Sequence, residues 1–227
     1  MTFEATRRAE AMGITDPGAQ RADAAGIRQL ASKLRLAGIA TSASDVLHNV
    51  EKPSPRELTA LLHLIIAALD ASPAPKYEWK GVARVFPADD LATLLDLSVS
   101  SLKRYASGER ATPDVVAARL HFLALVIGDL SGSYNDTGIR RWFERKRTQL
   151  DGRSPAAFLK PGWDPDDEGP QRVRELALAR EVERHGLGPL LLAGVGLERP
   201  AAAGVVDQDI DRAELLVGAL DHALDVV

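Results

Sequence analysis

Residues 88–110 constrain the fold most, because their apolar spacing requires two short helices with a tight turn between them. Leu91 and Leu95 lie four residues apart and therefore share one face of the first helix. The second helix is marked at both ends. Ser98 can accept a hydrogen bond from a backbone N–H of its first turn, and Gly108 can adopt the left-handed conformation after its last turn.

The second of these helices has one apolar face and one polar face. Val99, Leu102 and Ala106 have the spacing of an inner face. The outer face is small and basic, and it carries no carboxylate before Glu109. This pattern is typical of a helix-turn-helix whose second helix enters a DNA groove, although two helices of an ordinary bundle with a solvated basic face would share the spacing. The predicted DNA-contacting residues are Ser98, Ser100, Ser101, Lys103, Arg104, Ser107 and Arg110.

Two roles are predicted within this DNA-contacting set. Ser100 and Arg104 lie four residues apart on the outer face, so both should reach base edges if the helix enters the major groove. Lys103 and Arg110 are predicted to contact phosphates, which position a protein on DNA without distinguishing its sequence.

The composition favours a helical chain. Of the 227 residues, 45% are hydrophobic and 26% are charged, whereas only 5% are aromatic. We therefore predict an all-α fold, a helix-turn-helix core with additional N- and C-terminal helices. The chain has no cysteine, which excludes disulfides, thiolate metal sites and a catalytic thiol.

The N-terminal sequence MTFEATRRAEAMG has charges where a signal peptide needs an apolar core. No apolar run reaches the length of a membrane span. We therefore expect a cytoplasmic protein that has no membrane partner.

Charge is unevenly distributed along the chain, whose net charge is −4. From Pro161 onward there are six arginines and no lysine against fourteen carboxylates, whereas the first 160 residues hold 22 basic and 18 acidic residues. A basic body followed by an acidic region indicates that only one part of the surface faces nucleic acid.

Four regions are predicted along the chain. They are an N-terminal helical region at 1–72, a helix-turn-helix DNA-binding domain at 73–132, a basic segment at 133–165 and an acidic C-terminal helical region at 166–227. In the second region, 76–86 is compatible with either a strand or a helix. A long helix then begins at Thr112-Pro113 and ends near Gly132, where it would brace the recognition helix.

Two helical stretches carry more apolar surface than a small helix-turn-helix core needs. Residues 54–57 form a capping box with proline at the first helical position, and residues 58–69 are apolar nearly all round, so this helix should be buried in a core or against another subunit. His63 within it is predicted to be a core or interface histidine. Residues 209–226 carry apolar positions three and four apart. Together these stretches predict a homodimer.

The segment 133–160 is the second informative stretch. Asp136 or Thr137 is predicted to cap a helix whose inner face holds Ile139, Trp142 and Phe143. Between Gly138 and Arg153 there are six basic residues against two carboxylates, and the basic residues are Arg140, Arg141, Arg145, Lys146, Arg147 and Arg153. This cluster could contact a DNA backbone or an acidic partner, and the acidic loop at 164–168 could mask it.

No pattern that enzyme chemistry requires is present. The nucleophile elbow, the H-E-x-x-H motif and the phosphate-binding P-loop are all absent, and the five histidines are scattered singly. The aspartates at 164, 166 and 167 lack the ligand spacing of a calcium loop. We therefore predict no catalytic residue, no metal site and no cofactor.

Taken together, the helix pair and the segment after it resemble the antitoxins of RES–Xre toxin–antitoxin pairs. In that family a helix-turn-helix of the form L-x-x-L-L-G-[VI]-S-x-x-[ST]-L-x-R precedes a tryptophan-bearing helix followed by L-x-G-x-[ST]-P. The first motif matches here at Leu91, Leu94, Leu95, Ser98, Ser101, Leu102 and Arg104, and the second at Trp142, Leu150, Gly152, Ser154 and Pro155. Asp96 stands at the usual turn glycine, although aspartate tolerates the left-handed conformation better than most residues, and Leu97 stands at the usual valine or isoleucine.

The resemblance covers 88–165, little more than a third of the chain. It implies an antitoxin that represses its own operon on double-stranded DNA and neutralises a RES-domain toxin with NAD-consuming activity. The partner-binding residues that it implies are Arg140, Arg141, Trp142, Arg145, Leu150, Gly152, Ser154 and Pro155. Two alternatives remain, a stand-alone helix-turn-helix transcription regulator and a protein–protein adaptor without DNA contact.

Overall fold

The structure, a computed structural model, describes residues 2–18, 23–49 and 53–184. The chain divides into two compact units, 1–188 and 189–227, and every described residue belongs to the first. The predicted helix at 209–226 lies outside the described residues.

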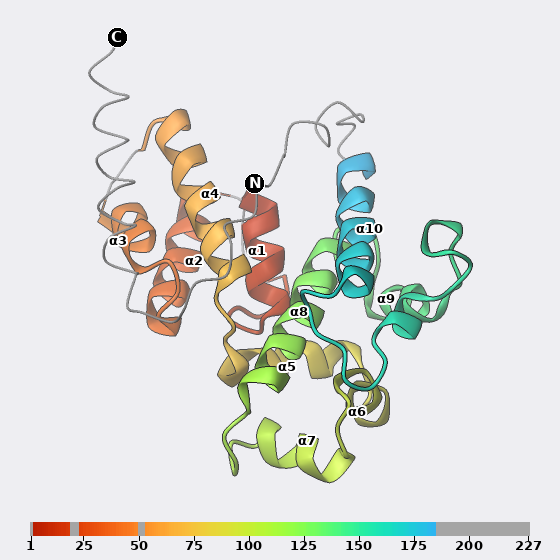
Figure 1. The fold of residues 1–227 in the computed structure, drawn as a ribbon. Coiled ribbons are helices and arrows are strands. Elements are labelled where there is room, and N and C mark those ends of the chain that lie inside the picture. Colours follow the sequence, from red (N-terminus) through yellow and green to blue (C-terminus); the bar gives the residue numbers. More distant parts are fainter. Residues whose placement is uncertain (1, 19–22, 50–52, 185–227) are drawn as a thin grey trace. The chain divides into compact units, whose positions relative to one another are not determined.

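The described residues are helical and contain no strand, which confirms the all-α prediction (Figure 1). The helices are α1 (Thr2–Ala11), α2 (Ala24–Ala37), α3 (Thr41–Asn49), α4 (Pro55–Ala71), α5 (Pro75–Val85), α6 (Ala88–Leu95), α7 (Val99–Ala106), α8 (Asp114–Leu130), α9 (Asp136–Glu144) and α10 (Glu168–Arg184). Two short 3-10 helices, Thr148–Leu150 and Pro155–Phe158, lie between α9 and α10. Over the same described ranges, no single helix is long and apolar enough to span a membrane, and only α4 and α5 together pass that test, with an 85° bend between them.

The long helix α8 lies at the centre of this unit, and α1, α5, α6 and α10 all pack against it (Figure 1). Every residue of α8 from Leu120 to Leu130 is buried. A helix enclosed by four others has no solvated side, which explains its apolar composition.

Several helix ends follow the sequence signals. Ser54 and Glu57 form the predicted capping box at the start of α4. Gly38 ends α2 in the left-handed conformation, with φ of 76°. The α9 cap differs from the prediction, because the side chain of Asn135, rather than Asp136 or Thr137, accepts the backbone N–H of Gly138. All three side chains can cap, and Asn135 does so because it is the residue just outside the first helical turn.

Residues 75–85, which the sequence left undetermined, form α5. Gly81 lies in this helix where the end of α1 approaches it. A Cβ at Gly81 would lie 2.0 Å from the carbonyl oxygen of Ala11. The glycine is therefore required for α1 and α5 to pack.

The helices α3 and α4 are covered on one face only. Val46 is 44% exposed, because α3 packs on α2 and α4 through Ala43 and Leu47. The α4 helix buries one face through Leu62, Ile65 and Leu69, whereas its other leucines and its other isoleucine are half-buried. His63 lies on the open side of α4 and is exposed, so it is not a core histidine within this chain.

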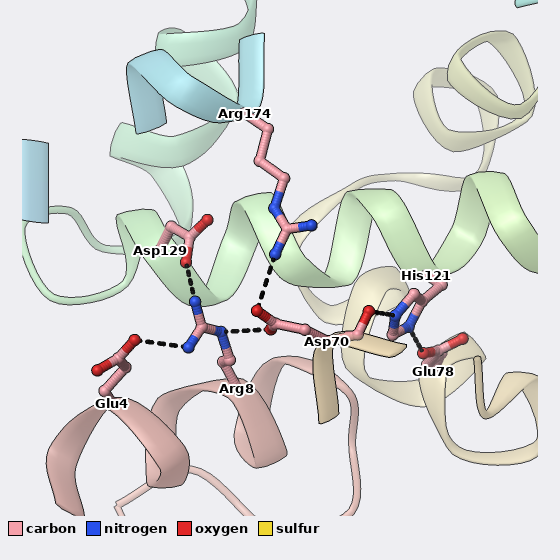
Figure 2. Close-up of polar contacts among 7 residues, drawn as sticks. All are labelled: Glu4, Arg8, Asp70, Glu78, His121, Asp129 and Arg174. Atoms are coloured by element: carbon pink, nitrogen blue, oxygen red, sulfur yellow. Dashed lines mark hydrogen bonds and ion pairs between the residues drawn. The ribbon is translucent and has the colours of Figure 1, made fainter. Parts of the chain in front are cut away.

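A buried ion network joins α1, α4, α8 and α10 (Figure 2). The guanidinium of Arg8 lies 2.6 Å from Glu4, 2.9 Å from Asp70 and 3.3 Å from Asp129. Asp70 also pairs with Arg174 of α10 at 3.2 Å. Arg8 is 3% exposed and Asp129 is 1% exposed. Burial raises the pKa of Asp129 to about 7, because the loss of hydration outweighs the attraction of Arg8 and Arg174.

A second buried pair lies beside this network (Figure 2). Nε2 of His121 is 3.0 Å from the backbone oxygen of Asp70, and Nδ1 is 2.6 Å from Oε1 of Glu78. A carbonyl oxygen only accepts hydrogen bonds, so Nε2 must carry a proton. The pair thereby connects α8 to α5 and to the end of α4.

Candidate nucleic-acid interface

The helices α6 and α7 form the predicted pair, separated by a three-residue turn from Asp96 to Ser98. Asp96 adopts the left-handed conformation, with φ of 57° and ψ of 50°, as expected for a residue at the usual turn glycine. Its side chain does what glycine cannot, because one carboxylate oxygen accepts the backbone N–H of Gly162 at 3.0 Å. The turn is therefore fastened to the loop that precedes α10.

Two buried side chains that sequence reasoning missed hold the end of α6. Arg119 of α8 donates to the backbone oxygens of Trp163, at 2.7 Å, and Leu95, at 3.3 Å. The indole N–H of Trp163 donates to the backbone oxygen of Leu94 at 2.9 Å. These bonds satisfy carbonyls at the C-terminal end of α6 that have no partner within the helix. No local pattern signals them, since the partners are 24 to 69 residues apart in sequence.

The start of α7 is capped as predicted. The Ser98 hydroxyl accepts the backbone N–H of Ser101 at 3.1 Å. It also lies 3.0 Å from the Ser100 hydroxyl and donates to the Ser101 hydroxyl at 2.9 Å. Ser98 and Ser101 thus serve the local structure of the helix start. After the helix, Gly108 adopts the left-handed conformation with φ of 75°, which confirms its predicted place.

The inner face of α7 differs from the prediction at one position. Leu102 and Tyr105 are buried, whereas Ala106 is exposed. Tyr105 takes the inner place because its ring stacks on Trp79 of α5, with centroids 6.4 Å apart. The indole N–H of Trp79 donates in turn to the Thr112 hydroxyl at 3.0 Å, so α5, α7 and the loop before α8 are held together.

The outer face of α7 is exposed at most of the predicted contact positions. Of the seven predicted contact residues, only Ser101 is half-buried. The exposed ones are Ser98, Ser100, Lys103, Arg104, Ser107 and Arg110. Within the described part of the chain, neither Lys103 nor Arg104 forms an ion pair. Arg110 lies over the ring of Tyr105 at 5.6 Å. An exposed row of unneutralised cations on a capped helix has the electrostatic character of a phosphate-binding surface.

The predicted partner-binding residues divide into two groups. Trp142, Leu150 and Pro155 are buried and stabilise the fold of the segment, and Trp142 also lines a hollow beside it. Arg140 is half-buried and donates to the backbone oxygen of Val85 at 2.7 Å. Ser154 is half-buried, and Gly152 is exposed with φ of 74°.

Arg141 and Arg145 are the exposed charged residues of the predicted partner-binding set. They line a hollow of about 450 Å³ together with Lys146 and Arg147. Arg147 lies 4.8 Å from the centroid of the Trp142 ring. The described residues that line this hollow include no carboxylate.

In the described part of the chain, the acidic loop forms hydrogen bonds within itself in place of the predicted masking contacts. Asp167 accepts the backbone N–H of Asp164, and Asp164 accepts that of Asp166, each at 2.9 Å. Asp151 forms an ion pair with Arg172, whose guanidinium donates to it at 2.9 Å. This hydrogen bond lowers the pKa of Asp151 below its usual value. Arg153 lies 3.9 Å from the same carboxylate.

Among the residues that the structure describes, no three histidine or carboxylate side chains gather in an arrangement that could hold a metal ion. No family model, curated protein or solved structure matches the chain. The resemblance to RES–Xre antitoxins therefore rests on the sequence motifs alone. The geometry of α6 and α7 is a separate observation that does not depend on those motifs.

Proposed function

We propose that this chain is a DNA-binding transcription regulator of the antitoxin type, whose helix α7 enters the major groove of double-stranded DNA. By binding there, the protein would repress the operon that encodes it. The proposal rests on the exposed face of α7, where Ser100, Lys103 and Arg104 face solvent and the two cations have no acidic partner in the described ranges. Ser100 and Arg104 would contact bases, and Lys103 and Arg110 would contact phosphates.

The way α7 is packed on the rest of the protein supports this role. Its inner residues Leu102 and Tyr105 are buried against the helices behind it, and α6 is bonded to α8 through Arg119. A recognition helix needs such support, because base contacts depend on a fixed position relative to the groove. We further propose a homodimer, since the two half-sites of an operator lie about 34 Å apart and a two-fold dimer matches them.

The test is in vitro selection from a random duplex library, followed by fluorescence anisotropy with the enriched duplex and a scrambled duplex of the same composition. Arg104→Ala should lose discrimination between the two duplexes, because an arginine bidentate to guanine contributes roughly 1–3 kcal/mol of discrimination. Lys103→Ala should weaken binding to both duplexes equally. If both variants keep wild-type affinity and selectivity, α7 is not the recognition helix.

Neutralisation of a RES-domain toxin is the second candidate function. The observation that favours it is the hollow lined by Arg141, Arg145 and Lys146, whose side chains form no ion pair with any described residue. Replacing these three residues by alanine should abolish co-purification with a RES-domain protein and leave binding to the enriched duplex unchanged. Selective DNA binding without any such partner would instead favour a stand-alone regulator. Loss of both activities in the wild type, even at low salt, would favour an adaptor.

A further inference from the structure

A second element contributes a cation beside the recognition helix. A hollow of about 370 Å³ lies at the C-terminal end of α7, and its lining comes from the start of α5 on one side and from the end of α7 and the following loop on the other. Lys76 and Arg110 line it together, with Ser107 and Thr112 as neutral polar neighbours, and its lining contains no carboxylate from the part of the chain that the structure describes. Sequence reasoning placed Arg110 on the DNA-contacting surface and did not consider Lys76.

The position of Lys76 is fixed by the packing of α5 on α7. Lys76 and Trp79 are three residues apart, so they lie on neighbouring positions of one helix face. Trp79 stacks on Tyr105 of α7 and bonds to Thr112, which holds this part of α5 against the end of the recognition helix. Lys76 is therefore attached to the same rigid assembly as α7, although 27 residues separate it from Lys103 in sequence.

Both cations are available to an anion. Lys76 and Arg110 are exposed, and within the described residues neither forms an ion pair. Each lies over the face of a tyrosine, Lys76 over Tyr77 and Arg110 over Tyr105, both at 5.6 Å. Such ring contacts orient a cation without neutralising its charge. Glu109 is nearby in sequence but does not line the hollow.

We propose that Lys76 and Arg110 together bind one backbone phosphate of the DNA, at the edge of the groove that α7 occupies. This inference rests on the proposed function, and it adds α5 to the interface. Lys76 would then position the protein on the duplex and would not distinguish its sequence.

The test compares Lys76→Ala with Lys80→Ala, a matched control on the same helix. Lys80 also carries one positive charge, but it does not line the hollow and it pairs with Asp16 at 2.9 Å. The probes are labelled duplexes of about 30 base pairs, long enough for two half-sites, with either the enriched sequence from the selection or its scrambled counterpart. Binding is measured by anisotropy over a series of salt concentrations.

The expected loss follows from counterion release. One phosphate contact contributes about −0.9 to the slope of log affinity against log salt, so its loss weakens binding about eightfold near 0.1 M salt and about fourfold near 0.2 M. Replacing both Lys76 and Arg110 by alanine should show this loss on both duplexes and flatten the slope by about 0.9, and Lys76→Ala alone should show part of it, because Arg110 still faces the same phosphate. Lys80→Ala should match the wild type.

The results separate the two proposals. If Arg104→Ala loses selectivity while Lys76→Ala keeps the wild-type affinity and slope, α7 binds DNA and the phosphate contact of Lys76 is refuted. An equal loss in Lys76→Ala and Lys80→Ala also refutes it, because the effect would then be one of net charge. If the wild type binds neither duplex at low salt, both proposals are overturned.

Discussion

Replacing Asp129 by asparagine should remove a pH dependence of stability that the buried ion network creates. Asp129 lies on α8, 1% exposed, with one carboxylate oxygen 3.3 Å from Arg8. Its other oxygen is buried and has no hydrogen-bond partner among the described residues. Asparagine has nearly the same shape and can still accept from Arg8, but it does not titrate.

The magnitude follows from the pKa of Asp129, which burial raises from 3.8 to about 7. Each pKa unit corresponds to about 1.4 kcal/mol, so a rise of about 3 units amounts to about 4 kcal/mol. The folded state holds this proton more tightly than the unfolded state does. The contribution to stability is therefore fully present below about pH 4 and is lost as the pH rises through about 7.

The assay is urea unfolding of the wild type and of Asp129→Asn at a series of pH values from about 4 to about 8. The difference in unfolding free energy between the two proteins isolates Asp129, because all other titrating groups are common to both. The wild type should lose about 4 kcal/mol relative to the variant across this range. Carbon-13 NMR of the Asp129 carboxyl would report its pKa directly.

The opposite sign would refute the reasoning. If attraction to Arg8 and Arg174 outweighed the loss of hydration, the folded pKa of Asp129 would lie below 3.8, and the wild type would gain stability relative to the variant as the pH rises. A difference that does not change with pH would equally show that burial does not perturb this carboxyl.

Two further predictions concern single positions in the fold. Gly81→Ala should destabilise the protein by about 3 kcal/mol, at the upper end of the overpacking range, because the new Cβ would lie 2.0 Å from the Ala11 carbonyl oxygen. A thermal unfolding midpoint equal to that of the wild type would contradict the packing of α1 on α5. Ser98→Ala should lower the free energy of unfolding in urea by about 1 kcal/mol, because α7 loses its N-terminal cap. Ser98→Thr keeps the hydroxyl and should retain most of that free energy. Equal losses in both variants would show that the hydroxyl does not cap the helix.

Much of the local structure could be predicted from the sequence. The capping of α4 by Ser54, the capping of α7 by Ser98 and the left-handed conformation of Asp96 all follow from residues within a few positions of one another. Helix ends depend on hydrogen bonds and steric limits that act over one turn, and these are encoded in consecutive residues. The exposed basic face of α7 was predictable for the same reason, since helical spacing alone divides its residues between two faces.

Other features were decided only by the tertiary structure. Tyr105 rather than Ala106 faces inward because Trp79, 26 residues earlier, offers a ring to stack on. Arg119 and Trp163 hold the end of α6, and Lys76 lies beside Arg110, through contacts between segments far apart in the chain. The partners of Arg8 come from α1, α4 and α8. Sequence periodicity identifies which face of a helix is buried, but it carries no information about which other helix covers that face, and buried polar groups take their partners from that helix.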